Sequence, residues 1–332
     1  MTPAVSVVIA THNYGRYLPA ALDSALGQTD RDFEIVVVDD GSTDDTPTVI
    51  QSYLHEPRLT YQRTERRGQP KAKNLGIRLA RGPLIAFLDA DDVWLPAKLE
   101  RQVPLFDGEP DLGVVYSRRL LVDEEGFELE YAQPSLHRGW VLSRIFRSNF
   151  VCFSSSVVRR RVFEAVGGFD ESIGLAIDYD LWLRVALGYR FDFVDEPLVK
   201  YRTGHESLSR RKRERIYTAL GIVNRFLDEG GGRIALPPSA VQRTMAELCC
   251  DMGGAVTGVE RMSWFLRALW HRPQHGLAWH ALLAFWWPDR LRSLVRRLLG
   301  RPDWERPRRV TPLTGVDAAL AVVNPVSIGG AT

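Results

Sequence analysis

The chain has few cysteines and no long apolar run. Cys152, Cys249 and Cys250 offer no CxxC or Cys/His spacing for a zinc site, and adjacent cysteines rarely form a disulfide. The sequence therefore excludes a disulfide scaffold and favours a reducing, cytoplasmic location. The apolar run Ala281–Trp287 is far shorter than the roughly 20 residues of a membrane-spanning helix. We expect no integral membrane helix, and the first ten residues lack the pattern of a signal peptide.

Lysine and the common nucleotide-binding and hydrolase motifs are also scarce. Of the 43 basic residues, 5 are lysine and 38 are arginine. We interpret this skew as genomic base composition, because the arginines do not alternate with aromatic residues as in a nucleic-acid platform. Nucleic acid is therefore not an expected partner. No GxGxxG follows a strand, and GxxxxGK[ST], HExxH and GxSxG are lacking, which removes the common phosphate loops, zinc proteases and serine hydrolases.

The composition that is present suits a large globular protein. The chain has 332 residues, of which 45% are hydrophobic and 25% charged. Such a chain can bury a sizeable core. Its length fits one large catalytic domain with an appendage, or two ordinary domains.

Strands and helices alternate along the first hundred residues. Buried β-branched runs predict strands, and apolar residues at helical spacing predict helices. Because the connections are short, this order predicts βαβ units and a parallel sheet, which is an α/β fold. The expected strands are Val5–Ile9, Phe33–Val38, Leu59–Gln62 and Leu84–Leu88, and the expected helices are Tyr17–Leu26, a segment ending near Leu54, and Pro70–Ala80.

The rest of the chain is mixed and then helical. From about residue 206 helical spacing dominates, and residues 310–332 have little pattern, so we expect a mobile tail there. The expected strands are Val114–Tyr116, Leu120–Leu129 within a hairpin, Phe150–Val158, Arg190–Val194 and Leu198–Tyr201, and the expected helices are Asp178–Leu187, 206–228, 238–258, 260–271 and 289–299.

Carboxylates follow two of the expected parallel strands. Asp39-Asp40 ends one, and Asp89-Ala90-Asp91-Asp92 ends another. Ligands of open α/β sheets bind outside the carboxyl ends of the strands. Asp89 and Asp91 can point the same way from extended backbone, and a hard cation such as Mg²⁺ or Mn²⁺ binds such carboxylates together with substrate phosphates. This pattern predicts a metal-bridged diphosphate site, and a capped turn is the plainer alternative.

Six motifs in a fixed order carry a resemblance over residues 4–210. They are Val5–Ile9 with Thr11-His12-Asn13, Val38–Asp44, Asn74–Ile77, Phe87–Asp92, Gly167–Glu171 and Asp178–Arg184. In order and spacing they resemble the inverting, bacterial-type family 2 glycosyltransferases of the GT-A fold.

The resemblance implies an α/β fold with a mixed, mainly parallel sheet flanked by helices and a C-terminal helical extension. It implies a catalytic domain over residues 1–210, with a nucleotide-sugar half of about 1–110 and an acceptor half of about 111–210. A helical region, 211–309, and the tail, 310–332, would follow.

The resemblance also assigns the donor site. Asp40 matches the acid that contacts the base, and Asp39 would support the ribose or the loop. Asp89 and Asp91 match the pair that holds the ribose and the metal–diphosphate, with Asp91 nearest the Mn²⁺ or Mg²⁺. Lys73 stands where the family usually has arginine, so it keeps the charge but lacks the planar fork. The expected nucleotide contacts on the first strand and its loop are Ala10, Thr11 and Asn13.

The general base implied by the resemblance is Asp178. The family has Glu before this Asp, whereas this chain has Ile177. Asp180 is the alternative base, and its plainer interpretation is a favourable charge at a helix N-terminus. Arg202 and His205 resemble a loop that closes over the donor diphosphate. His205 is a candidate metal ligand, or a loop histidine without that role.

These roles imply a metal-dependent inverting hexosyl- or deoxyhexosyltransferase. Its donor would be a nucleoside-diphosphate sugar, with UDP or dTDP expected first and GDP open. Its acceptor would be a saccharide or lipid-linked hydroxyl in cell-envelope polysaccharide or glycolipid synthesis. A catalytically impaired nucleotide-sugar binding or membrane-associated scaffold protein is the alternative, supported by Ile177. A nucleotidyltransferase fits poorly, because residues 10–18 hold only Gly15 and Arg16 of a glycine-rich basic loop.

Residues 260–309 form a basic and aromatic region. They carry eleven arginines against four acidic residues, together with several tryptophans. Basic helices with an apolar face can lie on an anionic bilayer. Two interpretations stay open: packing on the catalytic domain, or peripheral contact with the inner face of the plasma membrane.

Overall fold

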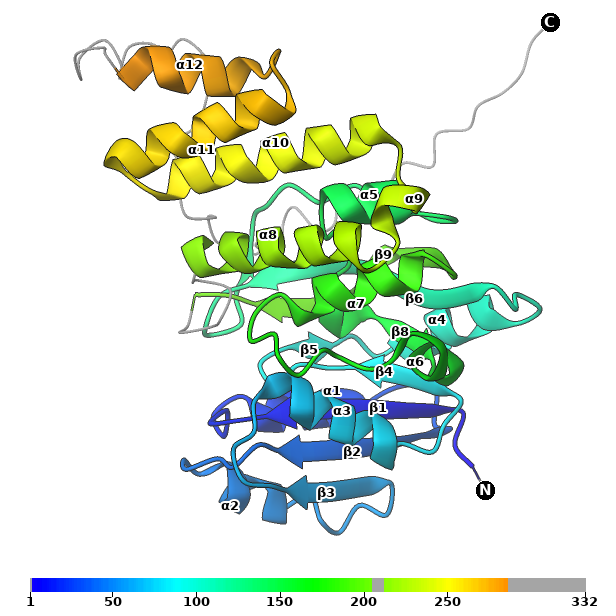
Figure 1. The fold of residues 1–332 in the computed structure, drawn as a ribbon. Helices are drawn as coiled ribbons and strands as arrows, with labels where there is room; N and C mark the ends of the chain where they lie inside the picture. Colours follow the sequence, from blue (N-terminus) through cyan, green and yellow to red (C-terminus); the bar gives the residue numbers. More distant parts are fainter. Residues whose placement is uncertain (1, 205–211, 286–332) are drawn as a thin grey trace, which may run out of the picture.

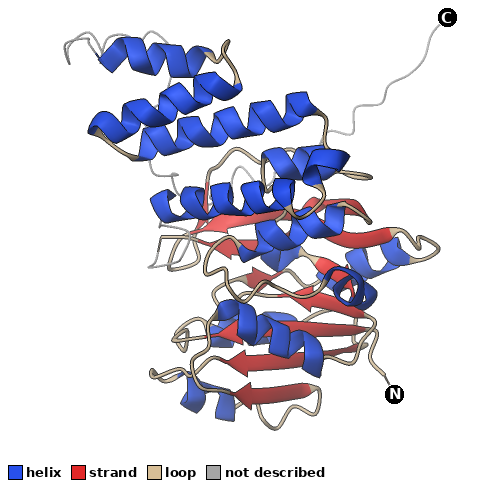
Figure 2. Ribbon diagram, in the orientation of Figure 1, coloured by secondary structure: helices blue, strands red, loops and turns tan. Residues whose placement is uncertain are grey.

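A computed structural model of the protein describes residues 2–204 and 212–285. Its centre is a nine-stranded sheet in the order β3-β2-β1-β4-β8-β6-β9-β5, with β7 paired to β6. Helices cover the sheet, and further helices are stacked beyond β6 and β9 (Figures 1 and 2). The strands are β1 (Val5–Thr11), β2 (Phe33–Asp39), β3 (Leu59–Arg63), β4 (Leu84–Phe87), β5 (Val93–Trp94), β6 (Leu112–Val122), β7 (Glu128–Leu129), β8 (Val157–Arg159) and β9 (Arg190–Arg202).

The first half of the sheet is parallel, as the sequence predicts. β1 pairs with both β2 and β4, and β2 pairs with β3, all in parallel. Alternate residues of β1 enter different apolar clusters: Val7 packs with α1, whereas Val8 packs with α3. The strand is therefore buried on both faces, which explains its continuous β-branched sequence. The helices of this half are α1 (Leu18–Leu26), α2 (Thr46–Gln51) and α3 (Gln69–Leu79).

The second half of the sheet is mixed and less regular. β8 runs antiparallel to β4 and β6, β9 runs parallel to β6, and β5 runs antiparallel to β9. The sequence predicts two strands in the region of β6 and two in that of β9. β6 and β9 are instead one long strand each. The register of the β6–β9 pairing shifts between Ser117 and Arg119.

The expected strand Phe150–Val158 is wrong over most of its length. A 3₁₀ turn, η2 (Phe153–Ser155), precedes the short strand β8. The hydroxyl of Ser155 donates to the carbonyl of Cys152 at 2.7 Å, and that of Ser156 donates to the carbonyl of Phe153 at 2.6 Å. Such local side-chain bonds compete with strand pairing.

Most of the long helices lie where the sequence predicts them, and several short ones were missed because they hold too few turns to show a period. The predicted segment 289–299 and the predicted tail 310–332 lie outside the described residues. Among the described residues, no helix is long and apolar enough to cross a membrane. The remaining helical elements are α4 (Lys98–Gln102), η1 (Val103–Phe106), α5 (Leu142–Arg147), α6 (Arg160–Val166), α7 (Ile177–Ala186), α8 (Lys212–Asp228), α9 (Gly232–Ala235), α10 (Pro238–Ala255), α11 (Gly258–His271) and α12 (Gly276–Phe285).

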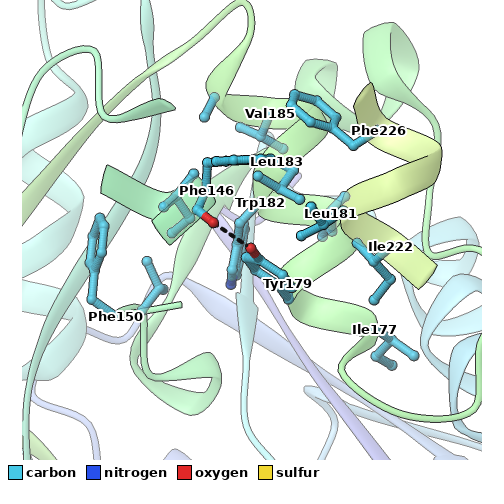
Figure 3. Packing of buried hydrophobic residues seen from close by; sticks show 14 of the residues in the cluster. Phe146, Phe150, Ile177, Tyr179, Leu181, Trp182, Leu183, Val185, Ile222 and Phe226 are labelled. Carbon is cyan, nitrogen blue, oxygen red and sulfur yellow. Dashed lines mark hydrogen bonds between the residues drawn. The ribbon is translucent and has the colours of Figure 1, made fainter. Parts of the chain in front are cut away.

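One apolar cluster joins the sheet to the C-terminal helices. Trp182 of α7 is fully buried in it, and Ile222 and Phe226 of α8 belong to the same cluster (Figure 3). The hydroxyl of Tyr179 donates to the carbonyl of Phe146 at 2.7 Å and so ties α7 to α5. α7 is therefore held between the sheet and α8.

Candidate functional site

Residues 89–92 form an acidic loop after β4, which we call the acidic loop. Contacts from the second half of the sheet hold it in place. The hydroxyl of Ser154 donates to Oδ2 of Asp92 at 2.5 Å and accepts the Asp89 N–H at 3.1 Å. The N–H of Arg202 donates to Oδ1 of Asp92 at 2.8 Å. Asp92 is 1% exposed, and these two hydrogen bonds to its buried carboxylate anchor the loop. Asp89 and Asp91 are half-buried at the same turn.

Negative charge accumulates in this loop. Burial raises the pKa of the Asp92 carboxyl, and the charges of Asp91 and Asp89 add to the rise. Burial also raises the pKa of Asp89 against the opposing effect of Lys73, and the charges of Asp91 and Asp178 contribute to the rise. The carboxylates of the loop and Asp178 therefore share one electrostatic environment.

Lys73 supplies positive charge to the acidic loop. Its Nζ lies 2.8 Å from Oδ1 of Asp89 and 3.6 Å from the centre of the Phe153 ring. The residue is 3% exposed, so this ion pair is well shielded from water. The structure thus brings together two of the residues that the sequence assigns to the donor site.

Arg202 lies at the end of β9 and binds backbone carbonyls. Its Nε donates to the carbonyl of Asp91 at 2.9 Å, and its Nη1 donates to the carbonyl of Glu124 at 2.7 Å. These bonds fix the backbone beside the predicted metal ligand. Contact of Arg202 with the donor stays a prediction.

The end of β2 is built around two buried carboxylates. Asp39 accepts the Ser42 N–H at 2.8 Å and the Tyr61 hydroxyl at 2.8 Å. Asp40 accepts the N–H groups of Arg67 and Gly68 at 2.6 and 2.8 Å. Asp40 therefore holds the loop that leads into α3, in addition to its predicted contact with the base.

The loop after β1 lies against the loop after β2. Ala10 and Thr11 pair with Val38 and Asp39 in the parallel ladder. Asn13 has φ 60°, and its Oδ1 accepts the N–H of Thr43 at 2.7 Å. All three predicted nucleotide contacts of β1 and its loop thus reach the same edge as the carboxylates.

Two residues of the Asn-Leu-Gly-Ile motif have clear structural roles. Nδ2 of Asn74 donates to the carbonyl of Phe169 at 2.9 Å, and its Oδ1 accepts the N–H of that residue at 2.8 Å. A Cβ at Gly76 would lie 2.4 Å from Cγ1 of Val8, so only glycine lets α3 approach β1 this closely. The motif joins the donor half to the segment that leads to Asp178.

Asp178 lies in the first turn of α7 and is half-buried. Its Oδ2 accepts the Nδ2–H of Asn149 at 2.7 Å. Ala176, just before the helix, has φ 53°, a left-handed conformation that is strained for a residue with a Cβ. No local pattern marks Asn149, so sequence reasoning missed it.

Asp180 is 6% exposed, and each of its carboxylate oxygens pairs with an arginine. Nη2 of Arg184 lies 2.7 Å from its Oδ2, and Nη2 of Arg225 lies 2.8 Å from its Oδ1. Arg225 also pairs with Asp170 at 2.6 Å. These contacts give Asp180 a role in fixing α7 and favour Asp178 as the base.

The donor set fits a hard divalent cation bound jointly with a substrate. Among residues 2–204 and 212–285, no group of three or more His, Cys, Asp or Glu side chains is arranged to hold a metal. Magnesium and manganese are commonly bound through one or two carboxylates plus phosphate oxygens, and Asp89 and Asp91 meet that need. The predicted ligand His205 lies outside the described residues.

Comparison with known proteins identifies the family. The model of glycosyl transferase family 2 matches residues 6–167. An uncharacterized glycosyltransferase of Methanocaldococcus jannaschii is 32% identical over 65% of this chain and 77% of its own length. Chondroitin synthase of Escherichia coli is 34% identical over 55% of this chain, but the match spans only 26% of that enzyme.

Solved structures of similar fold include two nucleotide-sugar complexes. The mannosyltransferase PcManGT of Pyrobaculum calidifontis, in complex with GDP-Man and Mn²⁺, has a TM-score of 0.54 and 22% identity over 90% of this chain and 85% of its own. TarS of S. aureus, in complex with UDP-GlcNAc, has a TM-score of 0.54 and 17% identity over 81% of this chain and 87% of its own. The mixed sheet and its flanking helices are those of the GT-A fold, and the chain belongs to the family 2 glycosyltransferases.

Proposed function

We propose that the protein is a metal-dependent inverting glycosyltransferase. It would transfer a hexosyl or deoxyhexosyl group from a nucleoside-diphosphate sugar to a hydroxyl of a saccharide or lipid-linked acceptor. We place the reaction in the synthesis of cell-envelope polysaccharide or glycolipid. The observation that carries the proposal is that the acidic loop, Lys73 and Asp178 share one site. Lys73 pairs with Asp89, and the charge of Asp178 contributes to the raised pKa of Asp89.

The donor would bind across the carboxyl ends of β1, β2 and β4. Ala10, Thr11 and Asn13 would contact the nucleotide, with Asp40 at the base. UDP-GlcNAc in TarS and GDP-Man in PcManGT support a nucleoside-diphosphate sugar here. We propose UDP or dTDP as the nucleotide, and the ligand test below decides between these and GDP.

Asp89 and Asp91 would hold a divalent cation together with the donor diphosphate, and His205 is proposed as a further ligand. The Mn²⁺ in PcManGT supports this assignment. A bound divalent ion supplies charge neutralisation for the leaving diphosphate. Lys73 would hold Asp89 in place, because the buried Nζ of Lys73 lies 2.8 Å from Oδ1 of Asp89.

Asp178 would act as the general base. Its carboxylate takes the proton of the acceptor hydroxyl while that oxygen attacks the anomeric carbon, and the bond to the diphosphate breaks. A single displacement inverts the anomeric configuration. Asn149 would orient the carboxylate through its 2.7 Å hydrogen bond.

Thermal unfolding with nucleotides tests the donor site. UDP, dTDP, GDP and CDP are each added with Mn²⁺ or Mg²⁺, and again with chelator. A ligand at about 100 times its dissociation constant adds ~2.7 kcal/mol, which raises Tm by about 5–10 °C for a chain of this size. We expect one nucleotide to give a metal-dependent rise that Asp91→Asn abolishes.

Asp107→Asn is the matched control, because Asp107 is exposed and makes no side-chain hydrogen bond among the described residues. It should keep the full rise in Tm. No rise with any nucleotide would contradict the proposal and favour the catalytically impaired binding or scaffold protein.

We also infer a cytoplasmic protein that contacts the inner face of the plasma membrane through α11. Val259, Leu266 and Trp270 share one face of this helix, and Trp270 is 86% exposed. Arg267 is exposed beside them and would attract anionic lipid headgroups. This arrangement supports membrane contact over packing on the catalytic domain for this face.

Sedimentation with phosphatidylglycerol vesicles tests the membrane contact. The double variant Leu266→Ser/Trp270→Ser should lose most of the binding. Ile234→Ser, which removes a 95% exposed side chain from α9, should bind as the unmodified protein does. Equal binding of both variants would contradict the inference.

A further inference from the structure

A hollow of about 290 Å³ lies on the face of α3 that points away from the acidic loop. Lys71, Leu75 and Arg78 follow one another at helical spacing and line it, whereas Lys73 on the same helix reaches Asp89. Thr64 and Arg67 add the loop before the helix, and Glu171 adds a wall from the second half. In Figure 1, α3 lies in front of β1 and β2 in the lower half of the view. We call this hollow the α3 pocket.

The α3 pocket is lined mainly by a strongly basic segment of the chain. Residues 63–78 contain six Lys or Arg residues and one acidic residue, whereas the whole chain has a net charge of +2. Among these, Arg63 lies near Asp39 and Lys73 pairs with Asp89. Arg67, Lys71 and Arg78 are exposed and make no side-chain ion pair or hydrogen bond within residues 2–204 and 212–285.

The one acidic residue of the lining, Glu171, offsets only part of this positive charge. Oε1 of Glu171 accepts the Nδ2–H of Asn74 at 3.1 Å. Three positive charges against one negative charge line the hollow, so the cations repel one another and would be stabilised by an anion. Arginine is well suited to carboxylate and phosphate because its planar group forms two parallel hydrogen bonds.

The floor of the pocket is apolar. Ala72 is 3% exposed and Leu75 is half-buried, and both pack against Val36 and Val38 of β2. A sugar ring can lie on such a floor through its C–H face. Lys71 and Arg78 are separated by about 10 Å along the helix axis, a span that suits a ligand longer than one anionic group.

We propose that the α3 pocket binds an acidic saccharide. Its ring would lie against Leu75, and its carboxylate or phosphate groups would pair with Arg67, Lys71 and Arg78. The assignment of this saccharide to the acceptor rests on the proposed function. Glu171 belongs to the segment that leads to Asp178, so a ligand in the pocket contacts the chain segment that precedes the proposed base.

Calorimetric titration of the full chain tests the proposal at low salt, without nucleotide or metal. The probes are trigalacturonate and a singly phosphorylated maltotriose, with maltotriose and inorganic pyrophosphate for comparison. We expect the acidic saccharides to bind, maltotriose not to bind, and the affinity to fall as salt rises. Lys71→Ala/Arg78→Ala should weaken binding at least tenfold, by about 1.4 kcal/mol or more.

The matched control is Arg101→Ala/Arg243→Ala. It removes the same charge from two other exposed helical positions that make no side-chain pair among the described residues, and it should bind as the unmodified protein does. Equal weakening in both double variants, binding of neither acidic saccharide, or equal binding of maltotriose would overturn the proposal. Pyrophosphate binding as tightly as the saccharides, with the same dependence on Lys71 and Arg78, would also overturn it.

Asp91→Asn separates this proposal from the donor site. The variant should keep full affinity for the acidic saccharides. In the unmodified protein, no nucleotide effect together with saccharide binding would contradict only the proposed function, whereas a nucleotide effect without saccharide binding would contradict only the α3 pocket.

Discussion

The two halves of the sheet hold their carboxylates in different ways. In the parallel half, Asp39 and Asp40 are bound mainly by backbone N–H groups of nearby turns. In the mixed half, Asp178 and Asp180 are bound by side chains: Asn149 and Arg225 lie 29 and 45 residues away in the chain, and Arg184 lies one helical turn away. The donor side is therefore held mainly by backbone groups of the loops at the sheet edge, whereas the acceptor side depends on side-chain pairs, of which those of Asn149 and Arg225 form only in the complete fold.

The largest expected effect separates the two acids of α7. Asp178→Asn should lower kcat by about 10²–10⁴-fold with little change in stability, because it removes the proposed base and keeps the shape of the side chain. Asp180→Asn should instead lower the free energy of unfolding by about 2–3 kcal/mol, because two arginines lose their charged partner. Single-turnover rates and denaturant unfolding measure the two effects. A larger loss of the chemical rate in Asp180→Asn would reverse the assignment.

The next effect concerns the ion pair that joins α3 to the acidic loop. Lys73→Met should lower the free energy of unfolding by about 2 kcal/mol and weaken nucleotide binding, because Asp89 loses a buried charged partner. Lys71→Met, at an exposed position of the same helix, should change stability by less than about 0.5 kcal/mol. Urea unfolding and nucleotide titration compare the two variants. Equal changes in stability and in nucleotide affinity for the two variants would show that Lys73 contributes only its positive charge on α3 and not its specific pair with Asp89.

A smaller effect distinguishes two neighbouring buried serines. Ser154→Ala should lower the free energy of unfolding by about 1–3 kcal/mol and weaken metal-dependent nucleotide binding, because Asp92 and the Asp89 N–H each lose a partner. Ser156→Ala removes a hydroxyl whose one hydrogen bond to the described part of the chain is to the Phe153 carbonyl. It should lower stability without weakening nucleotide binding. The same nucleotide affinity in both variants would argue against positioning of the acidic loop by Ser154.

The smallest effect lies in the backbone before Asp178. Ala176→Gly should raise the free energy of unfolding by about 0.5 kcal/mol, because relief of the left-handed alanine exceeds the added freedom of the unfolded chain. Thermal unfolding measures it. A fall in stability would show that contacts of the Ala176 methyl outweigh the backbone strain.

The sequence predicts the parallel half of the fold well and the mixed half less well. β1 and β2 begin at their expected residues and end two and one residues later than expected, because burial on both faces imposes a continuous apolar pattern. The segment around Ser154–Ser156 was predicted as strand, because its apolar flanks hide the local hydroxyl bonds that turn the chain. The fold class is confirmed by the structure and its relatives.

The predicted site residues can be recognised from short motifs, whereas the residues that hold them in place lie far away in the sequence. Asp40, Asp89 and Asp91 follow strands and can be found from position alone. Ser154 lies 65 residues from its partner Asp89, and no nearby pattern connects them. Arg225 was likewise invisible, because its acidic partners lie 45 or more residues earlier in the chain.

The double ion pair of Arg225 has a consequence for how this enzyme can be divided or recombined. Arg225 comes from α8, beyond residue 210, yet it binds Asp170 and Asp180 on either side of the proposed base. Ile222 and Phe226 of the same helix cover α7. We expect a chain cut at residue 210 to be insoluble, and a hybrid with another relative's C-terminal helices to work only if that relative supplies an equivalent arginine. We therefore expect the C-terminal helices not to behave as an independent module, because α8 packs against α7, the helix that carries the proposed base.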